Sequence, residues 1–234
     1  MADALLQVRD LHAWYGRSHV LQGVDFDVGQ GEIVALLGRN GSGRSTTARA
    51  LMGLVDCEGD VRWRGRGILG LRTFEIARAG IGYVPEDRAI FARLSVEQNL
   101  LLGLQRGKSG RWRVDHMYEL FPQLGARSRL EAGRLSGGEQ QMLALCRTLM
   151  GSPELIIVDE PTEGLAPQLV EQVGSFLQQI SRAGVAVLLV EQKLAIALAV
   201  SQRALVMGHG QVVFDGSPQQ LLASAELRRE WLEV

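Results

Sequence analysis

The stretch IVALLGRNGSGRSTT, residues 33–47, decides the fold. Its first five residues are all apolar, which predicts a buried strand rather than a strand with one face in solvent. Glycines at positions 38, 41 and 43 then allow sharp turns, so that successive N–H groups can point at an anion. The pattern matches the G-x-x-x-x-G-[K]-[ST] motif of phosphate-binding loops except at Arg44, where the motif has lysine.

The residues after the glycines add further groups for a phosphate. We predict that a helix begins near Arg44, and its N-terminus provides unpaired backbone donors and the positive end of the helix dipole. The Ser45 hydroxyl is placed to bind Mg²⁺. The alternative is a glycine-rich turn without a ligand, which the strand, glycines, cation and Ser-Thr pair together disfavour. The predicted phosphate-binding residues are Gly38, Asn40, Gly41, Ser42, Gly43, Arg44, Ser45 and Thr46.

Composition narrows the class of protein. The chain has 234 residues, of which 46% are hydrophobic, enough for one large α/β domain or two small ones. Its 25 basic and 26 acidic residues nearly cancel, which argues against a general nucleic-acid-binding surface. The two cysteines, Cys57 and Cys146, have no metal-binding spacing and fit a reducing compartment, where they pack as small apolar residues.

No targeting or membrane-spanning segment is expected. Residues 1–9 lack the basic start and long apolar core of an export signal. No run of about 18 apolar residues occurs, so nothing is expected to span a bilayer. Any action at a membrane would therefore need a partner.

The first part of the chain predicts strands on both sides of the phosphate loop. The GQG sequence at 29–31 predicts a hairpin that leads from the second strand into the phosphate-loop strand. His12, Trp14 and Tyr15 are expected in a loop before that second strand. Besides the loop strand, strands are expected at 5–8, 20–28, 61–64 and 81–84.

Helical patterns follow the loop. The helix from Arg44 is expected to close near Gly53, and residues 74–79 are expected to be helical. Residues 86–134 show short helical patterns, basic residues and no convincing buried strand. We therefore expect a helical subdomain inserted into the sheet domain over 86–134.

From Leu135 the alternation of strands and helices returns. Ser136 can cap a helix with apolar positions at helical spacing, and the apolar strand at 155–158 ends in Asp159 and Glu160. Alternating strands and helices imply a mostly parallel sheet, whose ligand site lies at the carboxyl ends of its strands. The remaining expected elements are a helix between Pro167 and Gly184, a buried strand at 185–190, a largely buried helix at 193–200, a hairpin of 205–207 with 212–214, and a helical tail from Pro218.

Two motifs in this part carry a family resemblance. LSGGEQQ at 135–141 resembles the signature of the nucleotide-binding subunits of ABC (ATP-binding cassette) transporters, and LIIVDEP at 155–161 lies correctly downstream. The resemblance covers essentially the whole chain and implies one nucleotide-binding domain, 1–234. It implies an α/β fold, a P-loop NTPase sheet core with an antiparallel β region and an inserted α-helical subdomain.

The resemblance also implies roles for residues, with ATP as the substrate and Mg²⁺ as the cofactor. Asp159 would hold the Mg²⁺ shell, and Glu160 would position or deprotonate the attacking water. Tyr15 matches the aromatic residue that stacks on adenine. In the family, the signature covers the γ-phosphate bound by the opposite subunit, which implies a head-to-tail dimer with ATP between two chains. The signature residues expected there are Ser136, Gly137 and Gly138.

Three departures from the common family pattern indicate a subgroup. Glu86 stands where the family usually has glutamine, Gln192 where it has histidine, and Ala166 where it has aspartate. Together they look like the smaller ATPase subunit of branched-chain amino-acid importers and its urea-importer and short-amide-importer relatives. Glu86 can approach the metal shell. Gln192 can hydrogen-bond the γ-phosphate but cannot exchange a proton near neutral pH as histidine does.

Arg44 departs from that subgroup as well. Arginine keeps the positive charge, but its side chain is longer, planar and forked, so it does not replace lysine conservatively in a tight loop. Losing a well-placed charge-stabilising group costs on the order of 10²–10³ in rate. The hypothesis from sequence is that ATP still binds while hydrolysis is slowed.

Three functions follow from these observations. The first is a transporter ATPase with integral membrane permease subunits and, indirectly, a solute-binding protein, at the cytoplasmic face of the cell membrane. The second is a catalytically weakened ATP-binding partner subunit. The third is a non-transport cassette working on nucleic acid or ribosomes, which usually has a second cassette or a long coiled-coil insertion that this chain lacks.

The sequence defines the partners and the substrate less well. This holds for the permease docking site, the transported solute and the second ATPase subunit. Ile90, Phe91 and Leu94 are candidates for a groove that receives the permease, and ordinary packing of the helical subdomain is their alternative. The transported solute is not encoded in this chain. The second ATPase subunit is either a copy of this chain or a related chain, and the subgroup favours a related one.

Overall fold

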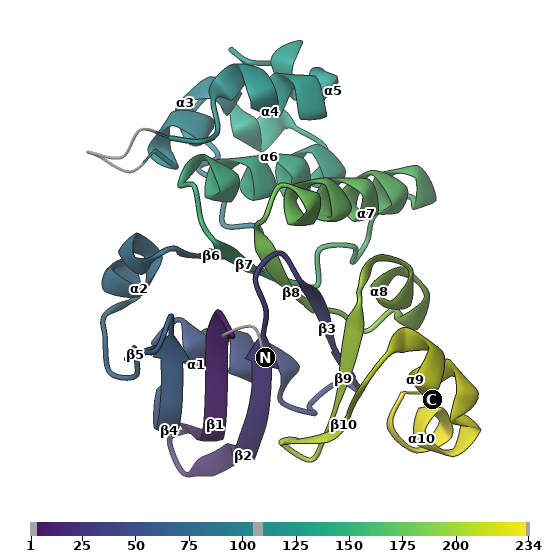
Figure 1. The fold of residues 1–234 in the computed structure, drawn as a ribbon. Helices are drawn as coiled ribbons and strands as arrows, with labels where there is room; N and C mark the ends of the chain where they lie inside the picture. The colour runs from purple at the N-terminus through teal and green to yellow at the C-terminus, as the bar shows by residue number, and fades with distance from the viewer. Residues whose placement is uncertain (1–3, 105–109, 233–234) are drawn as a thin grey trace.

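A computed structural model of the chain describes residues 4–104 and 110–232 and contains two sheets with helices around them (Figure 1). The larger sheet has the strand order β10-β9-β3-β8-β7-β6, and all neighbours are parallel except β9 and β10. This confirms the predicted parallel sheet and the predicted terminal hairpin. Its strands are β3 (Ile33–Gly38), β6 (Ile81–Val84), β7 (Leu155–Asp159), β8 (Ala186–Val190), β9 (Arg203–Gly208) and β10 (Gln211–Gly216).

The apolar run of β3 is continuous because both faces of the sheet are covered. Val34 packs into the core cluster that contains α1 (Arg44–Leu51) and the antiparallel sheet. Its neighbour Ala35 points to the opposite face, into the cluster that contains α8 (Leu194–Val200). Successive side chains of a strand point to opposite faces, so a strand covered on both sides has no polar alternation.

Two longer helices cover the rest of the face of the larger sheet on which α8 lies. They are α6 (Gly137–Met150) and α7 (Pro167–Arg182), which lie side by side over β7 and β8 (Figure 1). Val173 and Phe176 of α7 are buried in the same core cluster as Ile156 of β7. The amphipathic helix that begins at a proline is therefore confirmed.

The smaller sheet is antiparallel and differs from the prediction at β1. Its order is β2-β1-β4-β5, and β1 continues to Tyr15, so the expectation of a loop around His12, Trp14 and Tyr15 was wrong. Register shifts near residues 8–12 and a φ of 48° at Asp10 interrupt the strand's alternation, which hid its second half. The strands are β1 (Leu6–Tyr15), β2 (Ser18–Val28), β4 (Asp56–Trp63) and β5 (Arg66–Gly67).

The predicted hairpin at residues 29–31 was also wrong. β2 pairs with β1 in the smaller sheet, whereas β3 pairs with β8 and β9 in the larger one. The GQG sequence is a turn, but it passes the chain from one sheet to the other. Local turn chemistry specifies a change of direction and not which strand becomes the partner.

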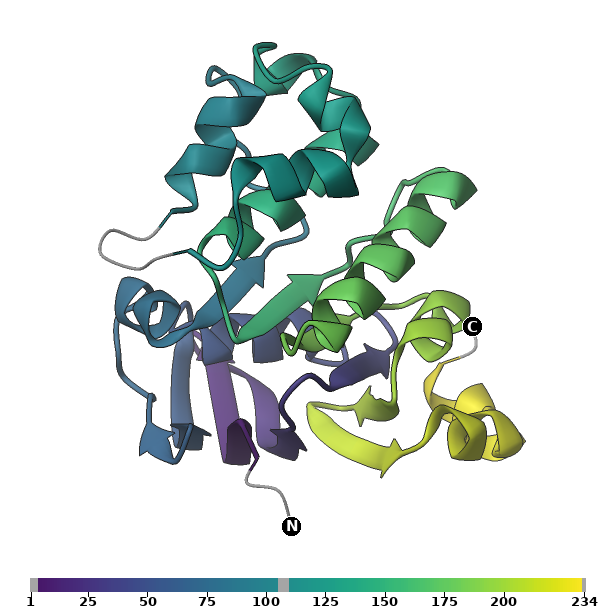
Figure 2. The same cartoon turned by 45° about the horizontal axis from the view of Figure 1, so that its top comes forward.

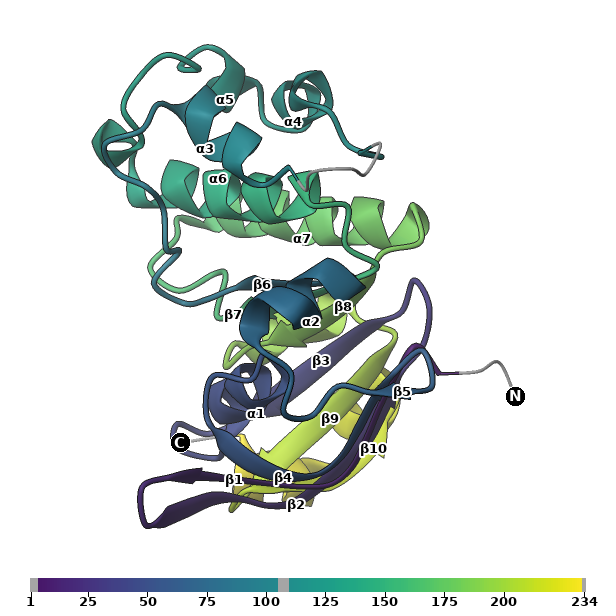
Figure 3. The ribbon, with the colours of Figure 1, turned by 90° about the vertical axis from the view of Figure 1, so that its left-hand side faces the viewer.

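The described residues between 86 and 134 are largely helical, as expected, and the subdomain bounds given from the sequence stay a prediction. This helical part contains α3 (Val96–Leu102), α4 (Val114–Leu120), α5 (Pro122–Gly125) and the short 3₁₀ helix η1 (Ala132–Arg134). Figures 2 and 3 show these helices grouped beyond α6, away from the smaller sheet. Within its described residues this part has only an isolated bridge between Ser95 and Glu131 and no strand.

The other helices lie where the sequence predicts them, but one of them is less buried than predicted. α1 ends at Leu51, close to the predicted Gly53, and α2 spans Thr73–Ala79. The expectation of a largely buried α8 was wrong, because only Ala197 and Val200 of that helix are buried. The helical tail is confirmed as α9 (Pro218–Ala223) and α10 (Ala225–Trp231). Over residues 4–104 and 110–232, no helix combines the length and the apolar character needed to cross a membrane.

The turn between β9 and β10 joins both sheets to the phosphate loop. The Gly210 N–H donates to the carbonyl of Ser42 at 3.1 Å, and the Gly210 carbonyl accepts from the N–H of Gln22 on β2 at 2.8 Å. A Cβ at position 210 would lie 2.1 Å from the carbonyl oxygen of Val20, and φ is +78°. Glycine is therefore required at this position by the space and by the backbone.

We expect Gly210→Ala to reduce the free energy of unfolding by about 3 kcal/mol, because it adds a clash to the strain of a positive φ. Gly65→Ala is the matched control, since Gly65 has a φ of +75° but nothing within 4 Å of its added Cβ. It is expected to cost about 1 kcal/mol, from the conformation alone. Urea unfolding of both variants measures the difference, and equal losses would contradict the steric role of Gly210.

Candidate functional site

The phosphate loop connects β3 to α1 at the carboxyl edge of the larger sheet. Gly43 is the N-cap of α1 with a φ of 107°, and a Cβ there would lie 2.7 Å from Cδ2 of Leu21. The carbonyl of Gly43 accepts hydrogen bonds from the N–H of Thr47 at 2.8 Å and from its hydroxyl at 3.0 Å. These bonds close the first turn, so the helix begins at Arg44 as predicted.

A cavity of about 320 Å³ lies against this loop. Its lining includes Glu86 after β6, Glu160 after β7 and Gln192 after β8, so three of the predicted site residues meet there. They meet because β3, β8, β7 and β6 are parallel neighbours whose carboxyl ends share one edge. Glu163, which the sequence analysis missed, lines the cavity as well. The loop residues in the lining are Asn40, Gly41, Ser42, Gly43, Arg44, Ser45 and Thr46.

Arg44 and Glu160 form an ion pair in this cavity. Nη2 of Arg44 lies 2.9 Å from Oε1 of Glu160 and donates a hydrogen bond to Oδ1 of Asn40 at 3.2 Å. The two charged side chains are only 5% and 12% exposed, so water screens the pair weakly. Nη1 of Arg44 is buried and has no hydrogen-bond partner among the described residues. An unpaired buried donor is costly, so an acceptor that reached this nitrogen would be bound favourably.

Glu160 has the chemistry of a proton acceptor. Burial raises its pKa to about 7; Arg44 lowers that pKa, while the carboxylates of Glu191 and Asp159 raise it. Its backbone has a φ of 48°, a left-handed conformation that side chains rarely adopt and that is common at functional sites. A carboxyl group that titrates near neutral pH can take a proton from water and release it again.

Asp159 and Ser45 form a second polar contact beside the ion pair. Oδ1 of Asp159 accepts a hydrogen bond from the Ser45 hydroxyl at 2.9 Å, and Oδ2 accepts one from the Tyr83 hydroxyl at 3.4 Å. Burial raises the pKa of Asp159. Hydroxyl and carboxylate oxygens suit Mg²⁺, which takes its other ligands from water and phosphate. Within the described residues no cluster of three His, Cys, Asp or Glu side chains could hold a metal ion.

Glu191 is a buried polar residue that the sequence analysis also missed. It directly follows β8 and is 1% exposed. Oε1 accepts from the hydroxyl of Thr162 at 2.6 Å and from its N–H at 3.2 Å, and Oε2 accepts from the N–H of Gln192 at 3.2 Å. This carboxylate therefore ties the segment that carries Gln192 to the loop after Glu160. The signal was present in the sequence, as a charged residue directly after an apolar strand.

Tyr15 and the signature residues lie outside the cavity lining, as do the predicted residues Gly38 and Asp159. Tyr15 stands at the end of β1, 44% exposed, and its hydroxyl accepts a hydrogen bond from Nη1 of Arg49 at 3.4 Å. Ser136 caps α6, where its hydroxyl donates to Oε2 of Glu139 at 2.8 Å and accepts from the Glu139 N–H at 3.4 Å. The predicted helix cap at Ser136 is confirmed, here as a capping box with Glu139, and Ser136, Gly137 and Gly138 do not line the loop cavity of their own chain.

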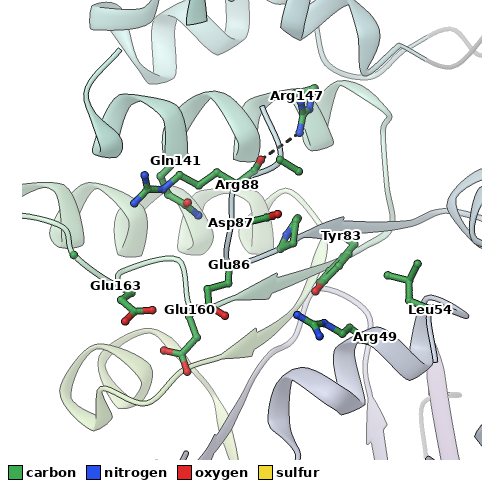
Figure 4. A pocket seen from close by; sticks show the side chains of 13 residues that line it. Arg49, Leu54, Tyr83, Glu86, Asp87, Arg88, Gln141, Arg147, Glu160 and Glu163 are labelled. Atoms are coloured by element: carbon green, nitrogen blue, oxygen red, sulfur yellow. Dashed lines mark hydrogen bonds between the residues drawn. The ribbon is translucent and has the colours of Figure 1, made fainter. Parts of the chain in front are cut away.

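A larger cleft of about 770 Å³ connects this cavity with the helical part (Figure 4). Glu86, Glu160 and Glu163 line both spaces, so the two are continuous. On the far side lie Arg88 and, from α6, Arg147, whose Nη2 donates to the carbonyl of Arg88 at 3.4 Å (Figure 4). The phosphate loop therefore faces an open space that can hold more than a phosphate.

Comparisons with known proteins agree with this geometry. The ABC transporter family matches residues 21–163. The chain is 39% identical over 231 residues to the high-affinity branched-chain amino acid transport ATP-binding protein BraG of Pseudomonas aeruginosa, covering 97% of this chain and 99% of the relative. It is 32% identical to the lipopolysaccharide export system ATP-binding protein LptB of Haemophilus influenzae, covering 98% and 97%. A crystal structure of the ADP conformation of an ATP-binding cassette matches with a TM-score of 0.82 at 25% identity, covering 97% of both chains.

We expect the Glu160 carboxyl to titrate near pH 7 in the ligand-free chain. Arg44→Gln is expected to raise this pKa further, because it removes the positive charge that favours the carboxylate. Carboxyl ¹³C NMR measures both pKa values, with Glu160→Gln to assign the signal. Arg39→Gln is the control, because Arg39 is exposed and donates to the carbonyl of Arg229. A wild-type titration at about 4, the ordinary range for glutamate, would contradict the effect of burial.

Proposed function

The chain belongs to the ABC transporter family, and on that premise we propose that it is the ATP-binding subunit of an importer for branched-chain amino acids. It is an ATPase of that family. The observation that carries the proposal is the meeting of the phosphate loop with Glu160 in one cavity, beside the hydrogen bond from Ser45 of that loop to Asp159. The 39% identity to BraG against 32% to LptB favours import. Export is the second candidate, because the LptB likeness also spans nearly the whole chain.

The reaction assigned to this cavity is transfer of the terminal phosphoryl group of ATP to water. The loop N–H groups and Arg44 bind the phosphates, and Gln192 hydrogen-bonds the terminal one. Glu160 orients a water molecule, which forms a bond to the terminal phosphorus as the bond to the ADP oxygen breaks. The water's proton passes to Glu160, whose pKa of about 7 suits that role.

Mg²⁺ would neutralise charge on the phosphate oxygens when it is bound. Ser45 and Asp159 are the residues that would hold it, since their oxygens already lie together at 2.9 Å. Glu86 lines the cavity and is exposed, so it is free to approach the same ion. The exposed ring of Tyr15 is the proposed contact for adenine, held by its hydrogen bond with Arg49.

The signature segment is proposed to complete the site of a second ATPase subunit. The capping box of Ser136 and Glu139 leaves other N–H groups of the first turn of α6 without partners within the helix, and such a helix start attracts anions. In a head-to-tail dimer, Ser136, Gly137 and Gly138 would meet the terminal phosphate held by the opposite chain. Pairing would then depend on ATP, which couples the nucleotide state to movement of the transporter.

Permease subunits are the proposed membrane partners, and they would hold the chain at the inner face of the cell membrane. A groove of about 450 Å³ between α2, β6 and α3 suits a helix from such a subunit. Phe91 lines it and is 51% exposed, whereas Ile90 packs against the core of the helical part. The apolar residues of this groove include Met52, Ala77, Ile81, Phe91, Leu102 and Pro153.

We expect the Glu160→Gln chain to pair in the presence of Mg²⁺ and ATP, with itself or with a related ATPase subunit, because bound ATP is no longer consumed. Adding Gly137→Asp is expected to abolish pairing while ATP still binds, since the new carboxylate faces the partner's phosphate. A Cβ at 137 meets only the flexible end of Arg88, 3.0 Å from Nη1, so the fold tolerates the change. Light scattering measures pairing. Gly67→Asp, at a position with open space, is the control that should still pair.

We expect permease subunits and a solute-binding protein to co-purify with the wild-type chain. Phe91→Asp is expected to reduce their recovery at least about tenfold, because it places a charge in an apolar groove. Phe74→Asp is the control, since Phe74 is 45% exposed on α2 but does not line the groove. Mass spectrometry of the co-purified proteins gives the readout. Recovery of only ribosomal or DNA-associated proteins would overturn transport in favour of a non-transport cassette.

A further inference from the structure

The two terminal nitrogens of Arg44 have unequal environments. Nη2 contacts two acceptors, Oε1 of Glu160 at 2.9 Å and Oδ1 of Asn40 at 3.2 Å. Nη1 is buried without an acceptor among the described residues, although Arg44 lines the phosphate-loop cavity. Nη2 is therefore occupied by two acceptors, whereas Nη1 can still donate a hydrogen bond.

Glu160 depends on Arg44 for its position. Within the described residues, Arg44 is the cation that pairs with the Glu160 carboxylate. The nearby carboxylates of Asp159, Glu163 and Glu191 repel it. Without a counter-charge in contact, a buried carboxylate among three others is either protonated or displaced, and each outcome removes the group that orients the water.

Building on the ATPase function proposed above, we propose that Arg44 is a positioning residue whose two branches act on different groups. Nη1 binds an oxygen of the terminal phosphate of ATP, while Nη2 keeps the Glu160 carboxylate beside the water that attacks that phosphate. Asn40 fixes the plane of the guanidinium between the two.

Lysine cannot divide its charge in this way. An ammonium group is a compact point charge, whereas a guanidinium is a planar fork with donors that point in fixed, separate directions. A lysine at position 44 that binds phosphate would leave Glu160 without its partner. The sequence alone favours the opposite view, in which arginine only slows hydrolysis, so the two hypotheses predict opposite effects of the same substitution.

Arg44→Lys in the full chain tests the proposal. With chain in excess over ATP and Mg²⁺ present, we expect the rate constant of hydrolysis to fall about tenfold, the order of effect of a misplaced catalytic group. ATP affinity is expected to change less than about threefold, because the charge at the phosphates is kept. This affinity also reports that the variant is folded. Arg39→Lys makes the same exchange in the same loop, away from Glu160, and is expected to keep the wild-type rate.

A double-mutant cycle separates positioning from simple phosphate binding. In a Glu160→Gln background, Arg44→Lys is expected to have little further effect on the rate, because the group that Arg44 positions is already lost. An equal or faster Arg44→Lys chain would overturn the proposal in favour of slowed hydrolysis by arginine. So would a loss of the same size in both backgrounds. A wild-type chain that neither binds nor hydrolyses ATP would instead overturn the proposed function itself.

Discussion

The contact between the Arg44 guanidinium and the Glu160 carboxylate is the interaction on which the site depends. Its two groups are 116 positions apart in the chain, since 160 − 44 = 116. They meet because β3 and β7 flank β8 in parallel register, with Ala35 beside Leu189 and Val158 beside the same residue. The apolar strands therefore do more than form a core. Their common direction brings a cation and a buried acid to one edge and keeps both out of bulk water.

Much of the architecture could be predicted from local patterns. Continuous apolar runs predicted buried parallel strands, and the glycine-rich loop predicted the start of α1 at Arg44. The same patterns gave wrong predictions where the pairing of a strand or the burial of a helix depends on residues far away in the sequence. The GQG turn gives no information on which sheet its flanking strands join, and the irregular register of β1 hid its extension to Tyr15. The apolar sequence of α8 likewise does not show that little of the structure covers it.

In the site, too, local sequence patterns predicted some residues, while contacts between distant residues were missed. The phosphate-loop motif predicted Ser45, and the family resemblance implied Asp159, Glu160 and Gln192, whose roles stay predictions. The ion pair of Arg44 could not be predicted, because it depends on side-chain direction and on the position of Asn40. The brace formed by Glu191 was missed since a glutamate after a strand is usually solvated, whereas here Thr162 and Gln192 satisfy it in a buried position.

The hydrogen bonds of Gly210 have a consequence for the energetics of ligand capture. This one residue is bonded to the phosphate loop at Ser42 and to the smaller sheet at Gln22, so the loop backbone is braced from two directions before any ligand arrives. A loop that is already ordered has little conformational entropy left to lose. The free energy gained from its amide–anion contacts can then appear almost entirely as affinity. The amides near Ser42 should also resist exchange with deuterium about as long as those of the core strands do.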